Sequence, residues 1–178
     1  VFAVIVLVTP LAYTAQGLND FLYGNDSMGA SEGTQVYEDD QQITKIFGRS
    51  NMLLALYPNT SEVNERAMAK EIKALPYVKS VTALADTLPE GIPEEFLPKS
   101  TVELLHKGGY CRMLVYTRTK TESAEAFKDS DAIQEIVKKY YPEGSYLVGE
   151  TPSTQDIKSF IVKDYENVNV LSLAGVFL

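Results

Sequence analysis

The sequence predicts a domain of the α+β class between two apolar ends. Short apolar runs of strand length alternate along residues 50–150 with longer amphipathic stretches of helical spacing. The 178 residues suffice for one domain with its own core, and 45% hydrophobic with 22% charged residues is usual for a folded protein. Residues 1–15 and 168–178, by contrast, contain no charged side chain. We therefore expect a folded middle region with an apolar segment on each side.

The first half of the middle region reads helix, strand, helix, strand. A helix is expected over 34–47. Residues 52–57 (MLLALY) are continuously apolar, which is typical of a strand buried on both faces. A second helix is expected over 61–75, before a proline, and a second strand over 77–84. The core contacts expected from this half are Val63, Met68, Ile72 and Leu75 on the helix and Val78 and Val81 on the strand.

The second half repeats the strand, helix, strand order after an interruption. Residues 86–109 contain three prolines and a short helical stretch, and they form an insertion. A strand over 110–119, a helix over 124–141 and a strand over 145–148 follow, and the helix carries apolar residues at helical spacing. Two strand–helix–strand halves predict a ferredoxin-like βαβ-βαβ sandwich, with an insertion between the halves and flanking helices.

The apolar ends suggest a relation to a membrane. A lipid-spanning helix needs about 20 apolar residues, so each end is the length of a truncated span. We therefore assign 1–20 to the end of a first transmembrane helix, 21–160 to the ferredoxin-like domain and 161–178 to a helix leading into a second transmembrane helix. The net charge of −8, with no Lys or Arg before Lys45, favours an extracytoplasmic domain and argues against a nucleic-acid partner.

No residue pattern predicts catalysis, a cofactor or a metal ion. The sequence contains no nucleotide-binding glycine loop and no metalloprotease motif. His106 is the single histidine, so we expect no catalytic triad and no histidine cage, only a structural imidazole at the end of a short helix. Cys111 is the single cysteine, which excludes an internal disulfide, and it is expected as a small buried hydrophobe. We expect no enzyme activity.

The insertion carries the candidate contact residues. Four apolar residues lie among its prolines: Leu88, Ile92, Phe96 and Leu97. They could form a lid, a flap facing a substrate or a docking edge for a partner domain. The simpler interpretation is a loop folded over the open side of the sheet, where these side chains cover apolar surface.

The order of these elements resembles the large extracytoplasmic loop of the RND superfamily of transporters, and within it the prokaryotic MMPL-type predicted exporters. The resemblance covers nearly the whole chain. It is carried by Phe47-Gly48 before the strand MLLALY, by the segment LPYVKSV at 75–81 and by VGETPSTQD at 148–156, which leads into the last helix. The family often has a second glycine in that last turn, where this chain has Glu150.

The resemblance implies a domain at the outer side of the cell membrane within a proton-driven exporter. The coupling carboxylates of that family lie in membrane helices outside this chain. The expected partners are membrane lipid, the second loop domain of the same parent protein and an amphiphilic or lipid-like substrate in a shared outer vestibule. The apolar ends could also drive self-association.

Two other functions remain open at this point. The extracytoplasmic domain of FtsX-like proteins also follows a first membrane helix and contains a helix before Pro-x-Val-x-x-Val, as here at 76–81. Its role would be mechanical coupling of an ATPase to a cell-wall hydrolase. A small anchored binding protein is the third possibility.

Overall fold

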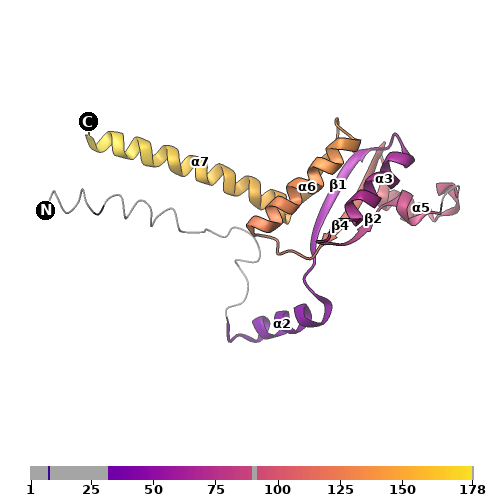
Figure 1. Ribbon diagram of the computed structural model, residues 1–178, viewed down its shortest axis with the longest axis horizontal. Helices are drawn as coiled ribbons and strands as arrows, with labels where there is room; N and C mark the ends of the chain where they lie inside the picture. Colours follow the sequence, from indigo (N-terminus) through magenta and orange to yellow (C-terminus); the bar gives the residue numbers. More distant parts are fainter. Residues whose placement is uncertain (1–7, 9–31, 90–91, 178) are drawn as a thin grey trace.

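One antiparallel sheet with two helices on one face forms the packed body of the molecule, at the right of Figure 1. The computed structural model describes residues 8, 32–89 and 92–177. The sheet contains β1 (Asn51–Pro58), β2 (Val78–Thr82), β3 (His106–Lys107), β4 (Tyr110–Thr117) and β5 (Tyr146–Gly149). The main strands lie in the order β2-β4-β1-β5, and β3 pairs with β4. Each half thus contributes one central and one edge strand, and the predicted ferredoxin-like α+β fold is confirmed.

The core lies between the sheet and the helices α3 (Glu62–Lys73) and α6 (Ala124–Tyr140). Met68, Ile72, Val78 and Val81 are buried as predicted, but Val63 is 77% exposed. Val63 lies in the first turn of α3 and points away from the sheet. The prediction that it is a core residue, which rested on its helical spacing, was therefore wrong. The largest fully buried core side chains are Tyr57, Leu53, Met68, Ile72, Met113, Ile133, Val115 and Val137.

Only one face of β1 is fully covered. Its residues alternate along the strand, with Leu53, Ala55 and Tyr57 buried and Met52 46% exposed. The expectation of a strand buried on both faces was wrong. Both helices of this fold pack on the same side, so among the described residues no second layer covers the opposite face of the sheet.

Residues with a hydroxyl side chain cap the N-termini of three helices. Thr34 precedes α2 (Gln35–Phe47), Ser61 precedes α3 and Ser123 precedes α6. In each case the side-chain oxygen accepts a hydrogen bond from the backbone N–H three residues later. These bonds satisfy N–H groups that the helix itself leaves unpaired, so the sequence sets these boundaries locally.

The insertion folds against α3. Residues 86–109 contain the end of α4 (Leu84–Thr87), the 3₁₀ turn η2 (Glu94–Phe96), α5 (Lys99–Leu105) and β3. Arg66 of α3 donates from Nη1 to the Leu88 carbonyl oxygen over 3.0 Å, and Lys73 of α3 pairs with Asp86. The expectation that the insertion covers the open side of the sheet was wrong. Its anchors come from the helical layer, and on the opposite face Tyr146 and Val148 remain 57% and 51% exposed.

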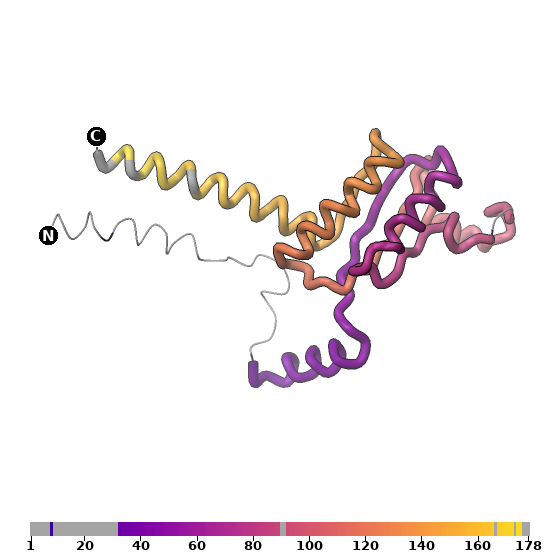
Figure 2. The backbone as a smooth tube through the Cα atoms, in the orientation of Figure 1, coloured from indigo at the N-terminus to yellow at the C-terminus, as the bar shows by residue number. Residues whose placement is uncertain are grey.

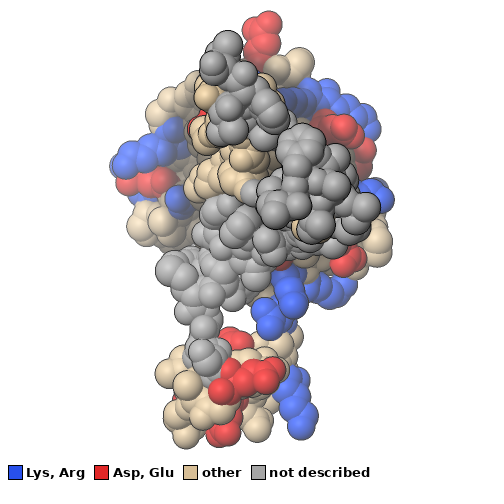
Figure 3. All heavy atoms as spheres, turned by 90° about the vertical axis from the view of Figure 1, so that its left-hand side faces the viewer, with Lys and Arg blue, Asp and Glu red and all other residues tan. Residues whose placement is uncertain are grey.

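Two helices extend away from the sheet (Figure 2). The first is α2, which has no buried residue and appears as a separate acidic lobe at the bottom of Figure 3. The second is α7 (Glu150–Phe177), which begins directly after β5. None of the described helices is long and apolar enough to cross a membrane. The predicted first transmembrane segment, 1–20, lies outside the described residues except for Val8.

Candidate functional site

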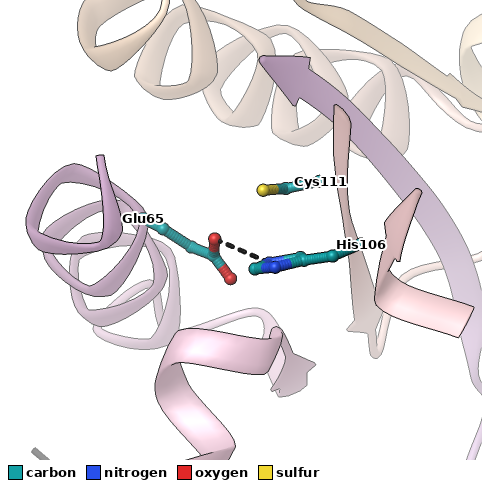
Figure 4. A group of neighbouring side chains, drawn as sticks. All are labelled: Glu65, His106 and Cys111. Carbon is teal, nitrogen blue, oxygen red and sulfur yellow. Dashed lines mark hydrogen bonds and ion pairs between the residues drawn. The ribbon is translucent and has the colours of Figure 1, made fainter. Parts of the chain in front are cut away.

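Three side chains of different chemistry converge at one buried point: Glu65, His106 and Cys111 (Figure 4). Their ligand atoms all lie within 4.8 Å of one another. Strand register explains the convergence, because Cys111 of β4 lies opposite both Tyr57 of β1 and His106 of β3. Residues directly opposite one another in antiparallel strands project to the same face of the sheet. Helix α3 covers that face, and the Glu65 side chain points from α3 toward His106 and Cys111.

Glu65 is a buried and hydrogen-bonded carboxylate, only 1% exposed. Its Oε1 accepts from the Ala85 N–H over 3.0 Å, and its Oε2 lies 3.2 Å from His106 Nε2. Burial opposes the negative charge and would raise the pKa of Glu65. The hydrogen bonds from His106 and the Ala85 backbone, together with the charge of His106, outweigh burial and lower the pKa.

His106 lies between two carboxylates. Glu94 of η2 approaches from the other side of the ring, with Oε1 2.7 Å from Nδ1. Burial opposes a positive charge on the ring, but the hydrogen bond and charge of Glu65 and the charge of Glu94 raise the pKa of His106. The imidazole thus joins the insertion, through Glu94, to helix α3, through Glu65.

Cys111 and Tyr57 complete the lining of this point. Cys111 is 1% exposed, as predicted for a buried hydrophobe, and burial together with the Glu65 charge raises its pKa. Such a thiol is protonated and shielded, which is the opposite of what a nucleophilic cysteine needs. The Tyr57 ring stacks on Tyr141 with centroids 4.7 Å apart, and its hydroxyl is buried with no aligned hydrogen-bond partner.

Sequence reasoning missed this cluster. His106 caps the C-terminal end of α5, as expected, and it begins β3. The expectation that it has no partner was wrong, because Glu65 and Glu94, 41 and 12 residues away along the chain, face its two ring nitrogens. The signal in the sequence was the pair Gly108-Gly109. Both have positive φ, and they turn the chain from β3 into β4 as a hairpin.

The four predicted contact residues of the insertion do not lie together. Leu88 is 7% exposed and belongs to a small second core with Leu84 and Leu105, against which Leu97 packs. Ile92 and Phe96 are 43% and 79% exposed. A role in contacting a substrate or partner thus remains a prediction, and it rests on Ile92 and Phe96.

The junction between the sheet and α7 is a second buried polar site. Thr151, in the first turn of α7, is fully buried; its hydroxyl accepts from Asn51 Nδ2 over 2.7 Å and donates to the Thr121 carbonyl oxygen over 2.7 Å. Just before it, a Cβ added at Gly149 would lie 2.8 Å from the Met52 carbonyl oxygen. The absence of a side chain lets β5 approach β1 here, and Thr151 then fixes the start of α7 to the domain.

An open groove of about 440 Å³ lies where α7 leaves α6. Phe127 and Val162 supply apolar surface, and Lys158 Nζ lies 6.0 Å from the Phe127 ring centroid. An apolar floor with an ammonium group at its edge is chemically suited to one end of an anionic amphiphile.

One further buried carboxylate lies apart from these sites. Asp129 of α6 is 8% exposed, and its Oδ2 has no hydrogen-bond partner. Burial and then the charge of Glu125 raise the pKa of Asp129, while Lys128 lowers it to a lesser extent. The adjacent Tyr77 also has a raised pKa, through burial and the Asp129 charge.

No protein-family model matches the chain, and no curated protein gives a significant match.

Proposed function

We propose that the chain is the extracytoplasmic domain of a proton-driven RND/MMPL-type exporter at the cell membrane. The observation that carries the proposal is the junction of β5 with α7: the last strand passes into a 28-residue helix without a loop. That helix contacts α6, β5 and β1, and Figure 1 shows it continuing away from the sheet; beyond Glu166 its sequence has no charge. This is the arrangement expected of an extracytoplasmic domain attached to a membrane helix.

Rigid attachment gives the domain a mechanical role. The fully buried Thr151 and the close approach at Gly149 leave no flexible linker between sheet and helix. A further contact, Gln155 Nε2 to both carboxylate oxygens of Asp131 at 3.1 Å, holds the next turn of α7 against α6. A tilt of α7 would therefore move the whole domain, as alternating access of an outer vestibule requires.

The groove between α6 and α7 is the proposed contact for the amphiphilic substrate. It lies at the base of α7, with Phe127 and Val162 for an alkyl chain and Lys158 for an anionic head group. The second loop domain of the parent protein would supply the rest of the vestibule. We expect neither catalysis nor a cofactor in transport itself.

The first experiment is to sequence the encoding gene beyond both ends of the chain. We expect the gene to encode several further membrane spans, one of them with a buried Asp or Glu, and a second extracytoplasmic loop with the same order of strands and helices. A parent protein with no intramembrane carboxylate and no second loop would refute it. In that parent, substitution of Phe127 by Asp should reduce export of an amphiphilic substrate, while Phe96→Asp on the insertion serves as the matched control.

The FtsX-like coupler is the second candidate, and one observation favours it. Phe96 and Ile92 of the insertion are 79% and 43% exposed, and exposed apolar side chains of this size suit docking of a protein partner. This function predicts few membrane spans, an ATPase partner and loss of hydrolase activation in Phe96→Asp, with Phe127→Asp unaffected. The same pair of variants thus separates the two functions.

A further inference from the structure

We infer that Glu65, His106 and Cys111 form a binding site for a divalent transition-metal ion of the zinc class. The inference is independent of the transport proposal. It stands on four observations: the convergence of an oxygen, a nitrogen and a sulfur ligand, the depth at which they lie, the position of Glu94 behind the imidazole and the unpaired Tyr57 hydroxyl beside them.

The donor set selects the metal. Zinc binds carboxylate oxygen, imidazole nitrogen and thiolate sulfur, whereas calcium and magnesium prefer several oxygen ligands. With a tetrahedral arrangement and the usual zinc bond lengths, neighbouring ligand atoms are about 3.3–3.7 Å apart. Glu65 Oε2 and His106 Nε2 are already 3.2 Å apart. Cys111 Sγ lies no more than 4.8 Å from the other ligand atoms, so it needs to move by at most about 1.5 Å.

The charges balance when the metal is bound. An ionised Glu65, a thiolate at Cys111 and a neutral His106 would carry two negative charges against a divalent ion. Binding displaces the thiol proton of Cys111 and the proton of His106 where that ring is charged, and both are released to solvent. The resulting neutral group is favourable at a site whose side chains are 1–9% exposed, because buried charges need compensation.

Glu94 takes the orienting position. A metal-bound histidine commonly faces a carboxylate with its second ring nitrogen, which fixes the ring and makes the ligand nitrogen more basic. Glu94 Oε1 lies 2.7 Å from Nδ1 but is not aligned for a hydrogen bond in the metal-free structure, so Glu94 orients the ring only after a small rotation of the carboxylate or the imidazole. Nε2 faces Glu65 and is left for the metal. Tyr57 is fully buried next to this group, and its hydroxyl has no aligned partner, so it can bond to a ligand oxygen or to a metal-bound water.

The site would tie the insertion to the rest of the domain. His106 and Glu94 both lie within the insertion, while Glu65 belongs to α3 and Cys111 to the central strand β4. Metal binding should therefore slow backbone hydrogen exchange in α4 and α5, and leave the exchange of α7 unchanged.

Cobalt(II) titration of the metal-free full chain tests the inference. Because the chain has one cysteine and one histidine, a thiolate-to-cobalt charge-transfer absorption can come from Cys111 alone within a monomer. We expect this absorption to saturate at one cobalt per chain and to disappear on addition of zinc. No such absorption in the folded chain, or cobalt affinity that is unchanged in Cys111→Ser, would overturn the site and leave a buried Glu65–His106 ion pair.

Two further variants change residues that are not buried, so they carry little risk of unfolding the chain. Glu94→Gln changes a side chain that is 43% exposed, and Glu95→Gln changes its exposed neighbour on the same turn. Loss of an orienting carboxylate typically weakens metal affinity about 10–100-fold. We expect that loss in Glu94→Gln and wild-type affinity in Glu95→Gln. Equal affinity in the two variants would overturn the orienting role of Glu94.

Discussion

Replacement of Thr151 by Val should loosen the attachment of α7 to the domain. Valine has nearly the same shape, but it removes the hydroxyl that joins Asn51 Nδ2 to the Thr121 carbonyl oxygen. A buried polar group left without a partner costs about 1–3 kcal/mol. Asn51 is only 3% exposed, whereas Thr121 is partly exposed, so the main cost falls on the Asn51 amide. We expect a loss of about 1–3 kcal/mol in the free energy of unfolding.

Urea denaturation of the full chain measures this loss. The slope of the unfolding free energy against urea should stay the same while the midpoint falls. Thr151→Ser is the matched control, because it keeps the hydroxyl and removes one methyl group, at a cost of about 1 kcal/mol. The reasoning is refuted if Thr151→Val lies within about 0.5 kcal/mol of the wild type, the range of ordinary surface substitutions, or if Thr151→Ser costs as much as Thr151→Val.

Three further predictions concern other parts of the domain. Gly149→Ala should destabilise by about 1–3 kcal/mol, because its Cβ would lie 2.8 Å from the Met52 carbonyl oxygen; thermal unfolding checks this. Asp129→Asn should raise the free energy of unfolding at pH 7, because it removes a buried negative charge. This gain should vanish as the pH falls through the raised pKa of Asp129, since the wild-type carboxyl then becomes neutral. Urea unfolding at several pH values measures the gain, and a gain that does not change with pH would contradict the prediction. Leu88→Ala should lower the free energy of unfolding by about 2–3 kcal/mol, because Leu88 is buried, and the exposed Phe96→Ala by less than about 0.5 kcal/mol. Equal losses in calorimetry would show that Leu88 is not part of a packed core in the insertion.

The positions of the helices and main strands could be read from local patterns. The helix over 34–47 matches α2 at its expected start and end, and the strand over 77–84 contains β2 with Val78 and Val81 buried. These features depend on neighbours a few residues away: a hydroxyl that caps a helix, a glycine or proline that ends it and the spacing of apolar residues. The strand–helix–strand repeat was then enough to predict the ferredoxin-like order.

Burial could not be read from hydropathy alone. The run MLLALY is equally apolar on both sides, yet only the side under α3 and α6 is fully buried. Val63 fits the apolar stripe of its helix but lies in solvent. Which face of an element is covered depends on where other elements pack, and the local sequence does not specify that.

The sequence by itself determined the local elements, their order and the acidic, single-cysteine character of the chain. Tertiary structure decided the functional sites, because their members are distant along the chain. Glu65 and His106 meet across 41 residues, and Asn51 and Thr151 across 100. Such pairs arise from strand register and helix packing, which bring each side chain to a shared face only after the sheet has formed. A histidine that looked isolated thus becomes, in the folded protein, the centre of a buried cluster.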